Sequence, residues 1–143
     1  MNFVVVDRQE MERGVLIRRP YIVISISDPG TPKPRIRTDG LCRAILRFRF
    51  HDAEPAGNFP TPPTIKLMTS GEAREIWEAV QQHRGQIDTI VVHCEAGMSR
   101  SPAVAAAICR ALGQDDLRFF REYQPNMHIY GLILHAAGMD AGR

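Results

Sequence analysis

Short runs of apolar residues along the chain have the length and spacing of buried β-strands. Residues 21–27, YIVISIS, are β-branched and almost wholly apolar, which is typical of a strand covered on both faces of a parallel sheet. Residues 3–6 and 87–92 form similar short runs, and residues 42–50 alternate between apolar and polar positions. The pattern therefore predicts four strands.

Between and after these runs, apolar residues recur at helical spacing. Thr69 and Glu72 have the spacing of a capping box at the start of one predicted helix. A second helix is expected over residues 101–112. Two shorter helices follow, one over about residues 115–123 and one that begins after the cap residue Asn126.

Strands that alternate with helices indicate an α/β fold with a central, mostly parallel β-sheet flanked by helices. The length suits a single domain, residues 1–143. Hydrophobic residues make up 44% of the chain and charged residues 24%, which is ordinary for a globular protein. No apolar run reaches the roughly 20 residues of a membrane span, so we predict no membrane association. The net charge of +2 is too small to indicate nucleic-acid binding.

The cysteine content indicates in which cellular compartment we expect the protein. Cys42, Cys94 and Cys109 are an odd number of cysteines, spread far apart in the sequence. This argues against a disulfide framework and favours a reducing, cytoplasmic setting. No pair has the CxxC spacing of structural zinc sites, so we expect no metal site.

The stretch IVVHCEAGMSRSPAV, residues 90–104, reads as a strand, a polar loop and a helix. The loop lies at the carboxyl end of the strand and the amino end of the helix, where ligands bind in open α/β sheets and free helix amides attract anions. Gly97 lacks a Cβ and permits a tight curve there. We expect the amides of residues 95–100 to converge on one tetrahedral anion.

Two side chains of this stretch supply reactive chemistry. Cys94 is expected to face the anion, and the helix dipole favours its thiolate form. Arg100 adds a planar fork that can hold two phosphate oxygens. These parts fit phosphoryl transfer through a cysteinyl-phosphate intermediate, with Cys94 as the nucleophile. No cofactor and no metal ion is required, because the cation is built into the chain.

The order His93, Cys94, five residues, Arg100, Ser101 resembles the HCx5R(S/T) signature of the cysteine-dependent protein tyrosine and dual-specificity phosphatases. The text HCEAGMSRSP is similar to the compact dual-specificity branch, and the resemblance extends from about Tyr21 onward. It implies a phosphotyrosine-phosphatase-like fold and hydrolysis of phosphomonoesters in proteins or small molecules. It leaves open whether the substrate is phosphotyrosine alone or also phosphoserine and phosphothreonine. The oligomeric state is open as well.

The resemblance also implies roles for the neighbouring residues. Ser101 would steady the thiolate and assist the second chemical step, and His93 would order the loop. The phosphate would be bound by the loop residues Glu95, Ala96, Gly97, Met98, Ser99 and Arg100.

A general acid is needed to protonate the leaving oxygen, which is typically worth about 10²- to 10⁴-fold in rate. In the resembling family an aspartate on a loop upstream of the cysteine has this role. Asp52 is our candidate, because it directly follows the predicted strand at 42–50. Glu54 and His51 remain alternatives, as does a plain turn role for Asp52.

Two further interpretations stay open at this point. The chain could be a catalytically impaired phosphate- or phosphopeptide-binding module, although Cys94 and Arg100 are both present. A sulfur-transfer or arsenate-reducing enzyme also uses a cysteine in an anion-binding loop, but the set of His93, Gly97, Arg100 and Ser101 fits those classes less well.

Charges around the loop suggest a substrate preference. An acidic Glu95 and the absence of a basic residue between Cys94 and Arg100 argue against highly phosphorylated lipids or inositols. A basic set further upstream is either a recruitment site for acidic phosphopeptides or a solvated loop. Its members are Lys33, Arg35 and Arg37.

Overall fold

The four predicted strands lie side by side in one sheet in the computed structural model, which describes residues 1–140; the last three residues of the predicted 1–143 domain lie outside the described part. The strand order is β1-β4-β2-β3, and every neighbouring pair is parallel. The strands are β1 (Asn2–Val6), β2 (Tyr21–Ser27), β3 (Cys42–Arg49) and β4 (Thr89–His93). The predicted α/β fold with a central parallel sheet is confirmed.

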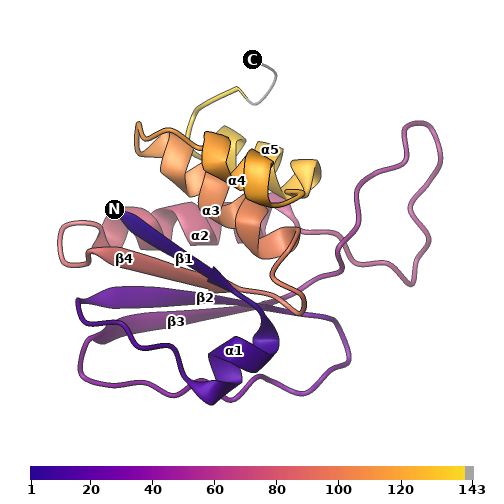
Figure 1. Cartoon of the computed structure of the whole chain (residues 1–143). Helices are drawn as coiled ribbons and strands as arrows, with labels where there is room; N and C mark the ends of the chain where they lie inside the picture. The colour runs from indigo at the N-terminus through magenta and orange to yellow at the C-terminus, as the bar shows by residue number, and fades with distance from the viewer. Residues whose placement is uncertain (141–143) are drawn as a thin grey trace.

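Two layers cover the sheet unequally. Four helices pack on one face, whereas α1 (Arg8–Arg13) lies on the other with the loops that follow β1 and β2 (Figure 1). The helices of the thicker layer are α2 (Ser70–His83), α3 (Arg100–Ala111), α4 (Leu117–Glu122) and α5 (Met127–Ala136). Within residues 1–140, no helix is long and apolar enough to cross a membrane.

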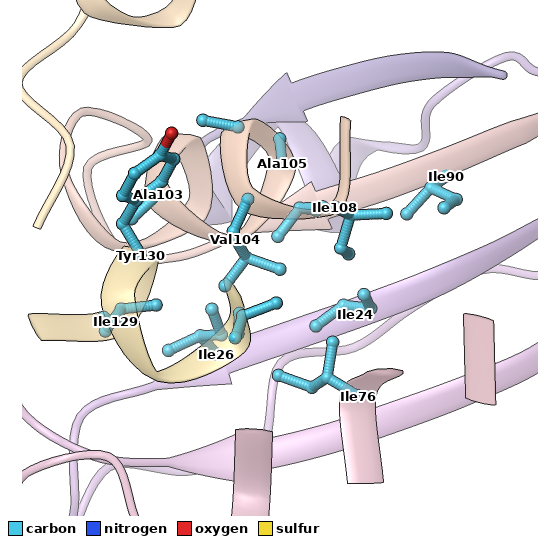
Figure 2. Packing of buried hydrophobic residues seen from close by; sticks show 14 of the residues in the cluster. Ile24, Ile26, Ile76, Ile90, Ala103, Val104, Ala105, Ile108, Ile129 and Tyr130 are labelled. Carbon is cyan, nitrogen blue, oxygen red and sulfur yellow. The ribbon is translucent and has the colours of Figure 1, made fainter. Parts of the chain in front are cut away.

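The main core lies between the sheet and the four helices. Figure 2 shows Ile24 and Ile26 of β2 facing Ile76 of α2, Val104 of α3 and Ile129 of α5. All seven residues of β2 are buried because β2 has a strand on each side and a layer over each face. The alternating strand β3 is at the edge of the sheet, and Phe48 is its only buried residue.

Local signals in the sequence set most helix ends. The amide of Glu72 donates to Thr69 Oγ1 at 3.1 Å and the Thr69 amide donates to Glu72 Oε1 at 3.0 Å, so the predicted capping box is present. Asn126 Oδ1 accepts from the amide of Ile129 at 3.1 Å and caps α5. α2 ends at His83, with Arg84 as its C-cap.

A long loop over residues 50–69 projects from the body of the molecule beside the carboxyl ends of the strands (Figure 1). Two hydrogen bonds close its base. The His51 amide donates to the Lys66 carbonyl at 2.7 Å, and the Lys66 amide donates to His51 Nδ1 at 2.9 Å. The loop therefore begins and ends at fixed points next to β3.

Candidate active site

The loop between β4 and α3 curls around the sulfur of Cys94. The Gly97 amide donates to Cys94 Sγ at 3.2 Å, and the hydroxyl of Ser101 in the first turn of α3 lies 3.1 Å from the same sulfur. Cys94 is only 2% exposed, so these donors replace water around it. An amide donor, a hydroxyl group and a helix amino terminus are groups that stabilise an anion bound beside them.

Gly97 makes the curl possible in two ways. Its φ of +70° is a left-handed conformation that residues with a side chain rarely adopt. A Cβ atom at this position would also lie 3.0 Å from the amide nitrogen of Asp7 and 3.1 Å from the carbonyl of Val6. The loop is therefore packed directly against the junction of β1 and α1.

Arg100 begins α3 and is 5% exposed. Its Nη1 donates to Asp28 Oδ1 at 2.7 Å and to the carbonyl of Phe50 at 2.8 Å. Asp28 directly follows β2 and Phe50 directly follows β3, so the carboxyl ends of two strands hold the guanidinium. Both bonds use Nη1, which leaves Nη2 and Nε as the groups of the fork that can face an oxyanion.

His93 ends β4 and is completely buried. Its Nε2 lies 2.6 Å from the hydroxyl of Ser25 on β2, and its Nδ1 lies 3.3 Å from the carbonyl oxygen of Cys94. A carbonyl can only accept, so Nδ1 carries the proton and Nε2 accepts from Ser25. Burial lowers the pKa of His93 below its ordinary value of 6.5, which favours this neutral ring. The ring joins β4 to β2 beneath the loop.

Asp52 lies beside the same loop. Its Oδ1 accepts from Ser99 Oγ at 2.8 Å and from Asn126 Nδ2 at 3.0 Å. Asn126 Nδ2 also donates to the Ala53 carbonyl at 3.0 Å, which fixes the start of the projecting loop against α5. Both donors contact Oδ1, so Oδ2 is the oxygen available to carry a proton.

The alternative acids are placed differently. Nδ1 of His51 accepts from the Lys66 amide at the base of the projecting loop. Glu54 is exposed in the projecting loop, and no contact within residues 1–140 joins its side chain to the phosphate loop. Of the three candidates, only Asp52 bonds to a residue of the loop.

The carboxylate of Glu95 is part of an ion pair. It lies 3.2 Å from Arg8 Nη1, and the carbonyl of Glu95 accepts from the Arg8 amide at 3.2 Å. The pair offsets the repulsion of anionic ligands that the sequence alone suggests. The remaining loop residues are held through their backbone or lie at the surface: Met98, whose carbonyl accepts from the Gln124 amide, is half-exposed, and Ala96 is exposed.

Sequence reasoning did not single out Asp28, Arg8 or a contact of Asn126 with Asp52. A signal for Asp28 was present, because it is the first residue after β2, and Asp52 likewise lies within three residues of the end of β3. Arg8 is two residues beyond the end of β1. The sequence predicted the cap role of Asn126 but not its second contact. The same amide side chain accepts from the Ile129 amide with its oxygen and donates to Asp52 with its nitrogen.

Within residues 1–140, the cysteines and the acidic residues form neither a disulfide nor a metal site. Cys42, Cys94 and Cys109 are all free. Among residues 1–140, no group of three or more His, Cys, Asp or Glu side chains is placed to hold a metal ion. The chemistry that the described residues offer is that of one enclosed thiol, one arginine and one carboxylate at the carboxyl ends of the strands.

No protein-family model and no curated protein matches the chain by sequence. Solved structures do match its fold. Human DUSP28 has a TM-score of 0.60 and 18% identity, covering 95% of this chain and 91% of that one. A mouse putative dual specificity phosphatase complexed with zinc tungstate has a TM-score of 0.51 and 21% identity, covering 82% and 70%. PTPMT1 in complex with PI(5)P has a TM-score of 0.53 and 13% identity, covering 96% and 90%.

The chain therefore has the fold of the dual-specificity phosphatases, as its cysteine-arginine signature predicts. The likeness to DUSP28 covers 95% of the chain, so it extends into the first 20 residues, where the sequence showed no resemblance.

Replacing Gly97 by Ala is expected to disrupt the loop. The added Cβ meets the backbone of Asp7 and Val6 and the left-handed φ disfavours any side chain, at a cost of roughly 1–3 kcal/mol. Urea unfolding and binding of orthovanadate, followed by calorimetry, measure the two effects. Gly85→Ala is the control, because Gly85 has open space around it. Equal stability and vanadate affinity in both variants would contradict this account of the loop.

The lowered pKa of His93 predicts a pH dependence of stability. Well above pH 6.5 the ring is neutral in both the folded and the unfolded chain, so it does not affect stability. As the pH falls below 6.5, the unfolded chain binds the proton more readily than the folded chain. The free energy of unfolding therefore decreases as the pH drops, until the pH reaches the lowered pKa of the folded chain. We expect the loss between about pH 7.5 and about pH 5.5 to be smaller in His93→Gln than in the wild type. Denaturant titrations at both values measure it, and an identical loss in the two proteins counts against the prediction.

Proposed function

We propose that the protein is a phosphomonoester hydrolase of the protein tyrosine and dual-specificity phosphatase type, acting through a cysteinyl-phosphate intermediate. The observation that carries the proposal is the enclosure of the Cys94 sulfur by the Gly97 amide and the Ser101 hydroxyl, with Arg100 at the start of the same helix. A merely structural thiol needs neither this curl nor a buried arginine beside it.

In the first step the Cys94 thiolate attacks the phosphorus atom and forms a sulfur–phosphorus bond. The bond between phosphorus and the ester oxygen breaks, and Oδ2 of protonated Asp52 gives its proton to the leaving alkoxide or phenoxide. The loop amides and the Nη2 and Nε groups of Arg100 stabilise the charge on the equatorial oxygens. Ser99 and Asn126 hold Asp52 by its other oxygen, so the acid is oriented toward the loop.

In the second step a water molecule attacks the phosphorus atom and gives one proton to the Asp52 carboxylate. The sulfur–phosphorus bond breaks, inorganic phosphate leaves and the thiolate returns. Ser101 favours this step, because its hydroxyl can donate to the departing sulfur at 3.1 Å. His93 is a positioning residue in this scheme, since it bonds to Ser25 and to the Cys94 carbonyl rather than to the sulfur.

The substrate class follows from the oxyanion site. We propose a phosphorylated protein or a small phosphomonoester, without a cofactor, a metal ion or a nucleic-acid partner. The mouse neighbour is complexed with zinc tungstate, and tungstate is a tetrahedral oxyanion like phosphate. The three free cysteines support a reducing, cytoplasmic setting.

Hydrolysis of p-nitrophenyl phosphate tests the proposal directly. This ester has a good leaving group, so turnover requires mainly the nucleophile and the oxyanion site. We expect activity that tungstate inhibits competitively and that Cys94→Ser abolishes, because the serine hydroxyl is not ionised at neutral pH. Cys42→Ser should keep the activity of the wild type. Tungstate binding without any turnover would instead support a phosphate-binding module that has lost catalysis.

Asp52→Asn tests the assignment of the acid. An asparagine oxygen can still accept from Ser99 and Asn126, so the change removes the proton and little else. We expect kcat to fall by about 10²-fold or more on phosphotyrosine and by much less on p-nitrophenyl phosphate. Steady-state kinetics with aryl phosphates of graded leaving-group pKa measure the difference. Glu54→Gln is the matched control, and an unchanged rate of Asp52→Asn on phosphotyrosine would remove Asp52 from this role.

A further inference from the structure

The loop after β2 presents three cations in one outward row. Lys33, Arg35 and Arg37 are exposed, whereas Pro34 between them is buried and Ile36 packs into the core beneath α1. An alternation of period two is the pattern of an extended chain, and the prolines of this segment favour that conformation. We call Lys33, Arg35 and Arg37 the basic row.

Three hydrogen bonds to two neighbouring elements, α1 and β3, fix this segment in place. Arg8 Nη2 donates to the Pro32 carbonyl at 2.8 Å, and Arg47 Nη1 donates to the Pro34 carbonyl at 3.0 Å. The Arg35 amide donates to Glu12 Oε2 at 3.2 Å. The backbone under the row is thus held by α1 and β3, so a partner would not have to order it on binding.

The basic row has no acidic partner of its own. Within residues 1–140, no carboxylate pairs with the side chain of Lys33, Arg35 or Arg37, although carboxylates pair with Arg8, Lys66 and Arg100. The three side chains line an open pocket of about 420 Å³, together with Arg8, Glu12 and Pro32. Unpaired cations around a hollow attract a polyanionic ligand.

The row begins next to the candidate active site. Arg8 contacts the Pro32 carbonyl with one nitrogen and the Glu95 carboxylate of the phosphate loop with another. One arginine side chain therefore separates the start of the row from the loop around Cys94.

The uneven distribution of charge supports the same picture. Residues 1–50, which form β1, α1, β2, β3 and the row, contain ten Lys and Arg against five Asp and Glu, a net charge of +5. Residues 51–143 contain eight against eleven, a net charge of −3. The small net charge of the whole chain therefore conceals a basic amino-terminal part, which contains the row.

We propose that the basic row binds acidic side chains at alternate positions of an extended substrate segment, on the same polypeptide as the phosphorylated residue; this rests on the proposed phosphatase function. Residues two apart in an extended chain are separated by about 6.6 Å, so the spacing of the row matches every second residue of such a segment. The row offers no apolar side chain to a lipid surface, since Pro34 and Ile36 face inward, and this favours a peptide over a membrane.

Kinetics with paired phosphotyrosine peptides test the proposal. One peptide of each pair carries three Glu at alternate positions, on the amino or the carboxyl side, and the other carries Gln there. For one of the two sides we expect kcat/KM to be about tenfold higher for the Glu peptide at low salt, as for several exposed ion pairs acting together. The variant Lys33→Gln, Arg35→Gln, Arg37→Gln should lose this preference.

A second triple variant, Arg18→Gln, Arg74→Gln, Arg84→Gln, removes the same charge from exposed positions elsewhere and should keep the preference. If the basic-row variant keeps the preference, or both variants lose it equally, the proposal is overturned. It is also overturned if the basic-row variant loses binding to phosphatidylserine vesicles while its peptide preference is unchanged.

A binding measurement separates this proposal from the proposed function. Fluorescence anisotropy of the labelled Glu and Gln peptides with Cys94→Ser protein reports affinity without turnover. If the Glu peptide binds more tightly than the Gln peptide, and the basic-row variant loses this difference, the proposed role of the basic row is supported. This holds even if the wild type is inactive on every ester. Equal affinity for both peptides overturns the proposal that the basic row binds acidic side chains, and it leaves the proposed hydrolase function untouched.

Discussion

The site depends on the tight curl of the backbone between β4 and α3. A straight connection would spread the amide groups of residues 95–100 along a line, and only a curl lets them face one sulfur or one phosphate group. The curl passes through the positive φ of Gly97 and through a contact in which a side chain would strike the backbone of Val6 and Asp7. The junction of β1 and α1 is therefore a wall of the site, even though its side chains have no chemical role in it.

The second requirement of the site is a compensated charge at Arg100. An unpaired guanidinium that is 5% exposed would cost several kcal/mol of desolvation, roughly the loss seen when one partner of a buried ion pair is removed. Asp28 and the Phe50 carbonyl supply the compensation from the ends of β2 and β3. Because the side chain of Asp28 is 41% exposed, water screens its charge, and the arginine keeps most of its attraction for an incoming oxyanion. An enclosed carboxylate in that position would compete with the phosphate far more strongly.

Local patterns were enough to predict the strands, the caps of α2 and α5, and the residues gathered around Cys94. The capping box of Thr69 and Glu72 spans four residues, and the signature from His93 to Ser101 is one continuous stretch. The contacts that the sequence did not reveal join distant segments: Asp28 and Arg100 are 72 residues apart, and Arg8 and Glu95 are 87 apart. They follow from the strand order β1-β4-β2-β3, which brings the ends of all four strands together, and an alternation of strands and helices does not specify that order.

The pairing of Arg8 with Glu95 changes how substrate preference has to be argued. From the sequence, the acidic residue in the loop suggested repulsion of highly charged ligands, but an ion pair at 3.2 Å presents little net charge. The remaining variable positions of the loop, Ala96, Met98 and Ser99, are neutral, so the loop itself discriminates weakly between anions. Under the proposed function, discrimination would then come from the segments that border the loop, and one of these, the segment after β2, carries the three cations of the basic row. If the protein is the proposed hydrolase, a phosphate loop with little selectivity of its own, next to a fixed row of cations, would select a substrate by the residues that surround its phosphate.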